Sequence, residues 1–189
     1  QVNQKGGWRW NTAKAFLRPT CYGRPNFELW TRGQVTRLVL ERDADGALRC
    51  TGADAWTGGE MQKARLTPGG ELLLAAGSIG SPQILQLSGI GPGALLQRHG
   101  IPVVADLPGV GANLQDHLQI RSVYQVRGAQ TLNQLASTPW GKARIGLQYL
   151  LSRSGPMSMA PSQLGAFTRS SPAFEWPNIE YHVQPLSLD

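Results

Sequence analysis

The chain has 189 residues, of which 41% are hydrophobic, and its formal net charge is +6 at pH 7. This length and composition suit one globular domain or parts of two, and they exclude a disordered chain. No apolar run approaches the ~20 residues that cross a bilayer. The basic residues are scattered, without the aromatic and basic stripe of a nucleic-acid platform. We therefore expect no transmembrane segment and no nucleic-acid partner.

The first elements expected along the chain are a short helix and a β-meander. Asn11 or Thr12 can cap the helix, and Pro19 is expected to stop it. Strand-like runs follow at residues 27–30, 34–42, 48–56 and 61–67. Short turns containing Asp-Gly and Gly-Gly separate the last three runs, which predicts an antiparallel meander.

An α/β pattern comes next. Residues 71–77 form a continuous apolar run, typical of a strand buried on both faces. Ser81 is a natural N-cap and Pro82 suits the first helical position, which predicts that a helix starts there. A second helix is expected at about residues 94–99, followed by an extended segment at residues 101–105.

The pattern changes from residue 118 onward. Apolar and polar residues alternate at residues 118–126 and 178–184, which predicts two half-exposed strands. Residues 139–153 predict a helix with one apolar face, formed by Trp140, Ala143, Leu147, Leu150 and Leu151. The expected fold class is therefore α+β, with α/β character before residue 117 and a mostly antiparallel sheet after it.

The turn between the predicted strand and helix at residues 75–80 is a candidate ligand contact. Ala76 and Gly77 leave room for a ligand at the end of the strand. Free N–H groups at the start of a helix favour phosphate. The same residue types also occur in turns that only connect two elements, so the pattern alone leaves both interpretations open.

Residues 77–91 read GSIGSPQILQLSGIG. They resemble, at every fixed position, a signature of the glucose–methanol–choline oxidoreductases: a small pair, Ser-Pro, two aliphatic residues and Ser-Gly-aliphatic-Gly. Residues 10–19, 33–38 and 99–117 are similar to other segments of that family. The resemblance covers essentially the whole chain, and it is closest to the choline and aliphatic-alcohol dehydrogenase branch.

The resemblance implies a two-domain flavoenzyme that oxidises the CH–OH group of a small alcohol, choline or another primary alcohol, by hydride transfer to FAD. Residues 1–117 would be part of an FAD-binding domain with a β-meander. Residues 118–189 would be part of an antiparallel-sheet substrate domain. Val35, Ala76 and Gly77 would face the FAD, with Val35 contacting the adenine through its backbone.

Two features of the family have no counterpart in these 189 residues. The Gly-rich dinucleotide fingerprint lies near the family's N-terminus, and the catalytic His with its His or Asn partner lies near its C-terminus. We therefore expect an internal fragment that has no catalytic residue and is inactive alone, even with FAD added. Surfaces left unpaired in such a fragment predict homodimerisation or aggregation. The alternative is a non-catalytic α+β interaction module derived from the same fold.

The three histidines are expected to have different roles. His99 ends a predicted helix, where a cation suits the dipole, so a structural role is expected. His182 is on the polar face of a predicted strand, which is typical of a surface residue. For His117, loop bracing and a place near the flavin are both open. Neither His117 nor His182 has a partner in the sequence that would orient it as a base.

Cysteine and tryptophan add little to the functional assignment. Cys21 and Cys50 have no zinc-ligand spacing and form no disulfide framework, so we expect no metal and a reduced, cytoplasmic protein. Trp8 and Trp10 are expected in a core or an interface, with the edge of a cofactor site as the alternative.

Overall fold

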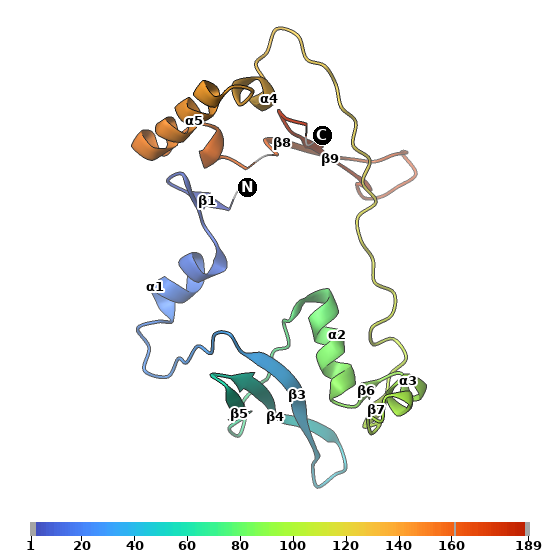
Figure 1. Ribbon diagram of the computed structural model, residues 1–189. Coiled ribbons are helices and arrows are strands. Elements are labelled where there is room, and N and C mark those ends of the chain that lie inside the picture. The colour runs from blue at the N-terminus through green and yellow to red at the C-terminus, as the bar shows by residue number, and fades with distance from the viewer. Residues whose placement is uncertain (1–2, 161, 188–189) are drawn as a thin grey trace. The chain divides into compact units, whose positions relative to one another are not determined.

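A computed structural model describes residues 3–160 and 162–187 of the chain. The chain divides into two compact units (Figure 1). The central unit is Glu28–Gln119, and the terminal unit joins Gln1–Phe27 to Ile120–Asp189. Helices and strands are mixed in both units, which confirms the α+β class. None of the helices in the described ranges is long and apolar enough to cross a bilayer.

The central unit contains the predicted meander. Strands β3 (Gln34–Arg42), β4 (Leu48–Thr57) and β5 (Glu60–Arg65) form an antiparallel sheet in the order β3-β4-β5. Gly58 and Gly59 make the second turn with φ of +64° and +89°. Two successive residues with positive φ match the twist of a tight hairpin, and glycine adopts this conformation without steric cost.

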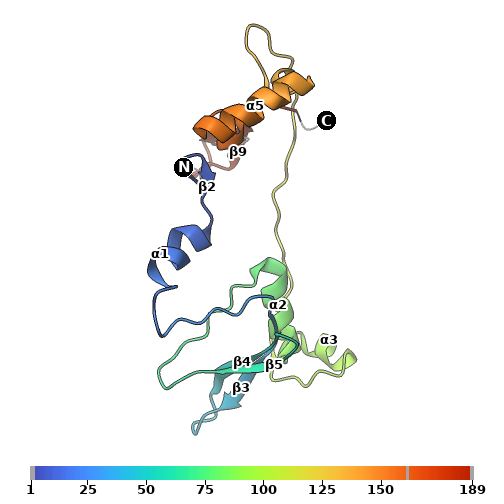
Figure 2. The same cartoon turned by 60° about the vertical axis from the view of Figure 1, so that its left-hand side comes forward.

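A short βαβ unit and a longer helix complete the central unit. Helix α2 (Gly77–Leu87) contacts β3 (Figure 2). Strand β6 (Ile90–Gly91) pairs in parallel with β7 (Ala105–Asp106), and α3 (Gly93–Arg98) connects them. The buried apolar side chains are Leu38, Ala55, Ile84 and Leu96.

The expected extended segment at residues 101–105 is only partly a strand, because pairing with β6 begins at Ala105. The expected helix at residues 94–99 is confirmed as α3, one residue earlier than predicted.

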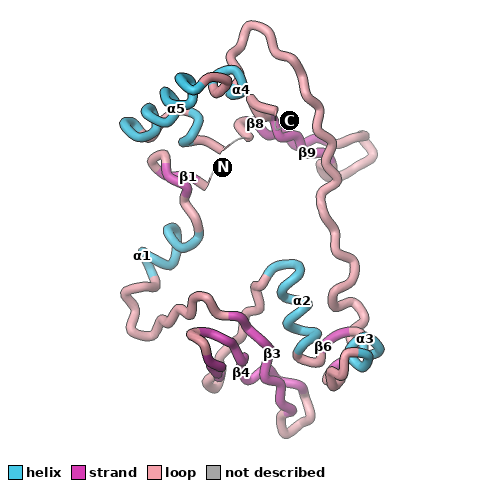
Figure 3. The backbone as a smooth tube through the Cα atoms, in the orientation of Figure 1, coloured by secondary structure: helices cyan, strands magenta, loops and turns pink. Residues whose placement is uncertain are grey.

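Three predicted strands are wrong. Residues 27–30, 71–75 and 118–126 form no strand, and Figure 3 draws them as loop. Most of their apolar side chains are exposed, with Leu73 85% and Leu118 96% exposed. An apolar run becomes a strand only where a second strand satisfies its N–H and C=O groups. No strand among the described residues pairs with any of these segments.

The N-terminal part of the terminal unit is a two-stranded hairpin followed by a helix. Strands β1 (Gln4–Lys5) and β2 (Trp8–Arg9) are antiparallel. The helix begins as a π-helical turn, η1 (Ala13–Leu17), and continues as α1 (Arg18–Thr20). The prediction that Pro19 stops this helix is wrong. Because the winding changes at Arg18, Pro19 lies in the first turn of the new segment, where a missing N–H costs little.

The C-terminal part of the terminal unit contains two further helices, a single 3₁₀ turn and a strand pair. Helix α5 (Pro139–Ser152) confirms the predicted helix, and the Thr138 hydroxyl caps it by accepting from the Gly141 N–H at 3.0 Å. Strand β9 (Ile179–Val183) confirms a predicted strand and pairs antiparallel with β8 (Leu164–Thr168), which has no clear sequence pattern. The remaining elements are α4 (Leu132–Leu135) and η2 (Pro156–Ser158).

Candidate flavin-contact turn and its supports

The turn before α2 has an accessible backbone. Gly77 has φ of +84°, a conformation that strains any L side chain. A Cβ built at Gly77 would meet no atom within 4 Å, and Ala76 and Gly77 are both exposed. A ligand could therefore approach the backbone of this turn closely.

Helix α2 starts earlier than predicted. It begins at Gly77, so Ser81 is not its N-cap and Pro82 lies inside the helix. Ser81 nevertheless supports the first turn, because its hydroxyl accepts a hydrogen bond from the Ala76 N–H at 3.0 Å. This bond satisfies one of the N–H groups that a helix start leaves without a helical partner. Ser81 of the signature thus holds the turn that carries Ala76 and Gly77.

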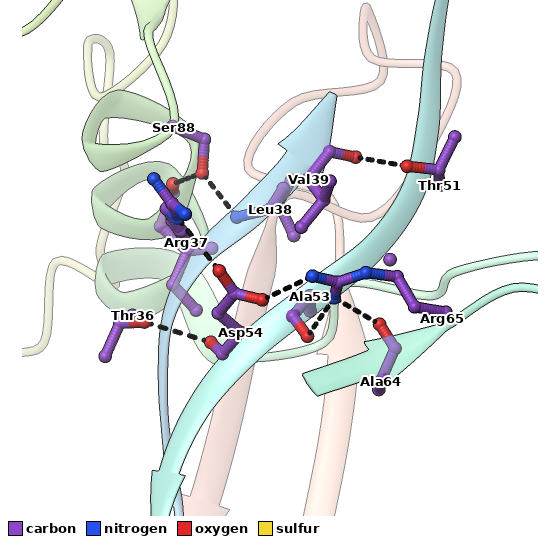
Figure 4. Close-up of polar contacts among 12 residues, drawn as sticks. Thr36, Arg37, Leu38, Val39, Thr51, Ala53, Asp54, Ala64, Arg65 and Ser88 are labelled. Atoms are coloured by element: carbon purple, nitrogen blue, oxygen red, sulfur yellow. Dashed lines mark hydrogen bonds and ion pairs between the residues drawn. The ribbon is translucent and has the colours of Figure 1, made fainter. Parts of the chain in front are cut away.

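The other end of α2 is fixed to the sheet through Ser88. The Leu38 N–H of β3 donates to Ser88 Oγ at 2.8 Å, and the Ser88 hydroxyl donates to the Ile84 carbonyl at 2.6 Å (Figure 4). Leu38 lies on the edge of the β3-β4-β5 sheet, where its N–H has no strand partner. One hydroxyl therefore both ends the helix and joins it to β3.

The glycines that follow Ser88 allow close packing. Gly89 has φ of +85°, and a Cβ there would lie 2.5 Å from the Pro102 carbonyl oxygen. At Gly91, a Cβ would lie 2.9 Å from Gln86 Cγ. Gly89 therefore has no room for a side chain, and one at Gly91 would have to displace the Gln86 side chain. The second half of the signature, from Ser88 to Gly91, is therefore structural, whereas Gly77 in the first half faces open space.

Val35 is the third predicted cofactor contact. It is the second residue of β3, is half-buried and pairs with Ala55. Ala76 and Gly77 lie together at the start of α2, and among the described residues no hydrogen bond or ion pair joins Val35 to either of them. Helix α2 is about 16 Å long, from 11 residues at 1.5 Å each. The predicted contacts thus belong to two different elements of the central unit.

A buried carboxylate joins the strands of the sheet that contains Val35. Asp54 is 3% exposed and accepts from Arg37 at 3.0 Å and from Arg65 at 3.0 Å, so it joins all three strands (Figure 4). The hydrogen bond from Arg37, together with Arg65, holds the pKa of Asp54 below its usual value, although burial opposes this. Because Arg37 and Arg65 both form ion pairs with this carboxylate, we assign Asp54 a structural role. No local sequence pattern indicates this cluster, because its three residues are 11 or more positions apart.

The histidines provide no assembled catalytic pair. All three are exposed. His99 follows α3, and the backbone N–H of His117 donates to Asp116 Oδ1 at 2.8 Å. The expectation that His182 has no partner is wrong: its Nε2 lies 3.0 Å from Glu180 Oε1 and its Nδ1 lies 3.4 Å from Ser162 Oγ. Glu180 and His182 are two residues apart on β9, so the alternation of the strand places both on one face.

The residues that the structure describes contain no evident metal-binding site. No group of three His, Cys, Asp or Glu side chains there could hold a metal ion. Cys21 and Cys50 are free thiols.

A second feature with ligand-binding character lies in the terminal unit. An open hollow of about 680 Å³ is lined by Trp8 and Trp10, three basic side chains and two small ones. Trp8 is 47% exposed, which is unusual for a large aromatic side chain in a core. The indoles therefore line a solvent-accessible site.

Comparison with known proteins places these features in a family. Residues 1–119 match the family model described as GMC oxidoreductase. The oxygen-dependent choline dehydrogenase of Brucella ovis is 39% identical over 182 residues, covering 96% of this chain and 31% of the relative. The alcohol dehydrogenase [acceptor] of Pseudomonas putida is 35% identical over 189 residues, covering 100% of this chain and 33% of the relative.

A solved structure agrees with this assignment. The FAD-dependent oxidoreductase from Chaetomium thermophilum is 28% identical, with a TM-score of 0.65, and the match covers 81% of this chain and 26% of that one. The chain spans about a third of the length of the curated relatives that it matches. Because the family model covers residues 1–119 and includes the complete 77–91 signature, the chain belongs to the GMC oxidoreductase family.

Proposed function

We propose that this chain contributes to an FAD-dependent oxidation of the CH–OH group of an alcohol, choline or another primary alcohol, by hydride transfer to the flavin. The observation that carries the proposal is the signature turn, in which Gly77 presents accessible backbone inside a segment that the family model matches. The names of the relatives supply the substrate class, since they include a choline dehydrogenase and an alcohol dehydrogenase.

Val35, Ala76 and Gly77 are the residues that would hold the FAD. The fit is supported at Gly77, where a side chain would occupy the open space before α2, and at Ala76, which is small and exposed. Contacts on two separate elements suit an extended dinucleotide better than a compact ligand. When bound, FAD supplies the electron sink that accepts a hydride, which side chains cannot provide.

The supports of α2 would position this cofactor wall. Ser81 holds the Ala76 N–H, and Ser88 fixes the far end of the helix to β3. A turn held at both ends keeps its backbone in one geometry, which reduces the ordering cost of binding. We assign no base among residues 1–189, since all three histidines lie on the surface.

The domain boundary stays a proposal. We place residues 1–117 with an FAD-binding domain and residues 118–189 with a substrate domain. The end of the central unit at Gln119 and the end of the family match at residue 119 support this boundary. Gln1–Phe27, by contrast, belongs to the same compact unit as Ile120–Asp189. A cytoplasmic location is supported by the two free thiols.

The decisive test compares two glycine substitutions in the purified flavoprotein. Gly77→Ala places a methyl group in the proposed cofactor wall and should lower FAD affinity by about tenfold or more, equivalent to ~1.4 kcal/mol, because the methyl group prevents the close approach of FAD to the backbone. Gly69→Ala is the matched control, because Gly69 has φ of +78° and equally open surroundings. Flavin absorbance per protein reports the result. Equal flavin retention in both variants would contradict a cofactor contact at Gly77.

The alternative of a non-catalytic interaction module has one observation in its favour, the large apolar side chains that both units leave exposed. Flavin-free protein that forms stable complexes would support this alternative. Flavin bound by the wild type, and lost only in Gly77→Ala, would exclude it.

A further inference from the structure

The positive charge of the protein is concentrated in the terminal unit. Of the 18 Lys and Arg residues, 11 lie in that unit, which holds only 3 of the 12 Asp and Glu residues. Residues 1–27 contain five basic residues and no acidic residue. A one-sided excess of this size attracts anions, and it disfavours a cationic ligand such as choline at the same surface.

Part of this charge surrounds the hollow in the terminal unit, which we call the basic hollow and define by Lys5, Trp8, Trp10, Lys14 and Arg18. The five residues come from β1, β2, η1, α1 and the link after β2. None of the residues that line the hollow is acidic. Within the described ranges, none of its three cations takes part in an ion pair.

The indoles contact both lysines of the basic hollow. Lys5 Nζ lies 5.1 Å from the centre of the Trp10 ring, and Lys14 Nζ lies 5.5 Å from the centre of the Trp8 ring. Lys14 Nζ also donates to the Arg9 carbonyl at 3.1 Å. Cation–π contacts of this kind orient an ammonium group without neutralising it. The charge therefore stays available to a ligand.

Contacts to α5 brace the walls of the hollow. The guanidinium of Arg153 lies 4.3 Å from the centre of the Trp8 ring, and the Tyr149 hydroxyl donates to the Gly7 carbonyl at 3.0 Å. Gly7 is buried and has φ of +75° in the turn between β1 and β2. The hairpin that carries Lys5 and Trp8 is therefore fixed against a long helix before any ligand arrives.

We propose that the basic hollow binds the phosphate group of a small soluble molecule. Three unpaired cations match a doubly charged anion better than the single charge of a carboxylate. Arg18 offers a planar fork of donors, and the two lysines offer point charges. The site shares no residue with the proposed flavin contacts, so phosphate binding can be tested independently of the proposed function.

The test follows the indole N–H signals of Trp8 and Trp10 by NMR while inorganic phosphate is added at constant ionic strength. Trp8→Phe and Trp10→Phe assign the two signals. We expect both to shift in a saturable way while the other indoles stay in place. No shift of either signal, or parallel shifts of all indoles, would overturn the proposal.

A matched pair of double variants isolates the charge of the hollow. Lys5→Gln with Lys14→Gln should weaken phosphate binding by about tenfold or more, because charge-assisted hydrogen bonds are lost. Lys63→Gln with Lys142→Gln removes the same charge from exposed lysines elsewhere and should leave binding unchanged. Lys5→Arg with Lys14→Arg keeps both charges and should retain binding. This variant shows whether changing the two side chains disturbs the fold by itself. Equal weakening by both Gln pairs would overturn the proposal.

AMP distinguishes the source of the phosphate. Tighter binding of AMP than of inorganic phosphate, read at Trp8 and Trp10, would identify a nucleotide. Equal binding would identify phosphate alone, and both results support the site. Trp56, which pairs with Gln34 beside Val35, reports separately on the proposed adenine contact. A response to AMP at Trp56 without one at Trp8 and Trp10 would overturn the proposal for the hollow and leave the flavin site intact.

Discussion

Asp54 shows how one residue fixes the strand order of the central unit. It lies in the middle strand, is almost fully buried, and accepts from one arginine on each neighbouring strand. A buried carboxylate is tolerated only when it is paired and hydrogen-bonded. Because both arginine side chains reach the solvent, their charges need not be desolvated in full. The arrangement favours the charged form of Asp54 in the folded protein.

Stability should therefore depend on pH through Asp54. The folded-state pKa of Asp54 lies below the unfolded value of about 3.9. Its contribution is fully present above that unfolded pKa and is lost as the pH falls through the lower folded-state pKa. Asp54→Asn should be less stable than the wild type at neutral pH, and the difference should shrink in acid. Urea unfolding from pH 7 to pH 2 checks this, and a constant difference across that range would contradict it.

Ser88 provides a second test at the residue scale. Ser88→Ala leaves the Leu38 N–H without its acceptor, and we expect a loss of about 1–2 kcal/mol of unfolding free energy. Ser78→Ala is the control, since Ser78 is exposed in the same helix. Chemical denaturation measures both variants. Because Ala has a higher helix propensity than Ser, propensity cannot account for a loss, and equal effects in both variants would contradict a contribution from the bond to β3.

Among the elements, α5 combines clear end signals with an exposed apolar face. Thr138 caps its start, and Arg153 ends it in a left-handed conformation with φ of +52°. No residue of α5 is buried, and Trp140 and Leu151 are 84% and 79% exposed. Exposed apolar surface of this kind marks an interaction site.

We expect this face to drive self-association of the 189-residue chain. Leu147→Gln with Leu151→Gln should weaken the association by about tenfold or more, since each buried Leu contributes ~1.5–3 kcal/mol. Lys142→Gln with Arg144→Gln changes two exposed polar positions of the same helix and is the matched control. Sedimentation over a range of concentrations measures the effect. A wild-type chain that stays monomeric at high concentration would refute the prediction.

At the scale of the whole molecule, the basic residues are unevenly distributed, and the histidines form no catalytic site. The excess of basic residues is confined to the terminal unit, whereas the signature turn lies in the central unit. His99, His117 and His182 are all exposed, and within the described ranges only the imidazole of His182 lies beside a carboxylate, that of Glu180. A general base must be oriented toward the proton that it removes and tuned near the working pH. The three histidines are instead exposed to solvent, which does not provide this orientation.

The 189-residue chain should therefore not oxidise choline or simple primary alcohols when FAD is added. A missing general base alone costs ~10²–10⁴-fold in rate. A dye-reduction assay with FAD in excess tests this, with heat-treated chain as the control. Turnover above that control, abolished by His117→Ala, would show that His117 acts as the base.

The sequence by itself determined the features that short windows encode. The meander followed from strand-like runs and the Gly58-Gly59 turn, and α5 followed from its apolar spacing. The family followed from residues 77–91, because a fixed order of small, Ser-Pro and aliphatic residues is rarely met by chance.

Only the tertiary structure decided the features that join distant segments. The bond from Leu38 to Ser88 spans 50 residues, and the Tyr149 hydroxyl reaches Gly7 across 142. The same physics explains the predicted strand at residues 71–75 that did not form: its apolar side chains favour burial, but a strand needs a neighbour to satisfy its backbone. Local sequence specifies how a segment bends and which face is apolar, whereas the partner that completes each hydrogen bond is set by the rest of the fold.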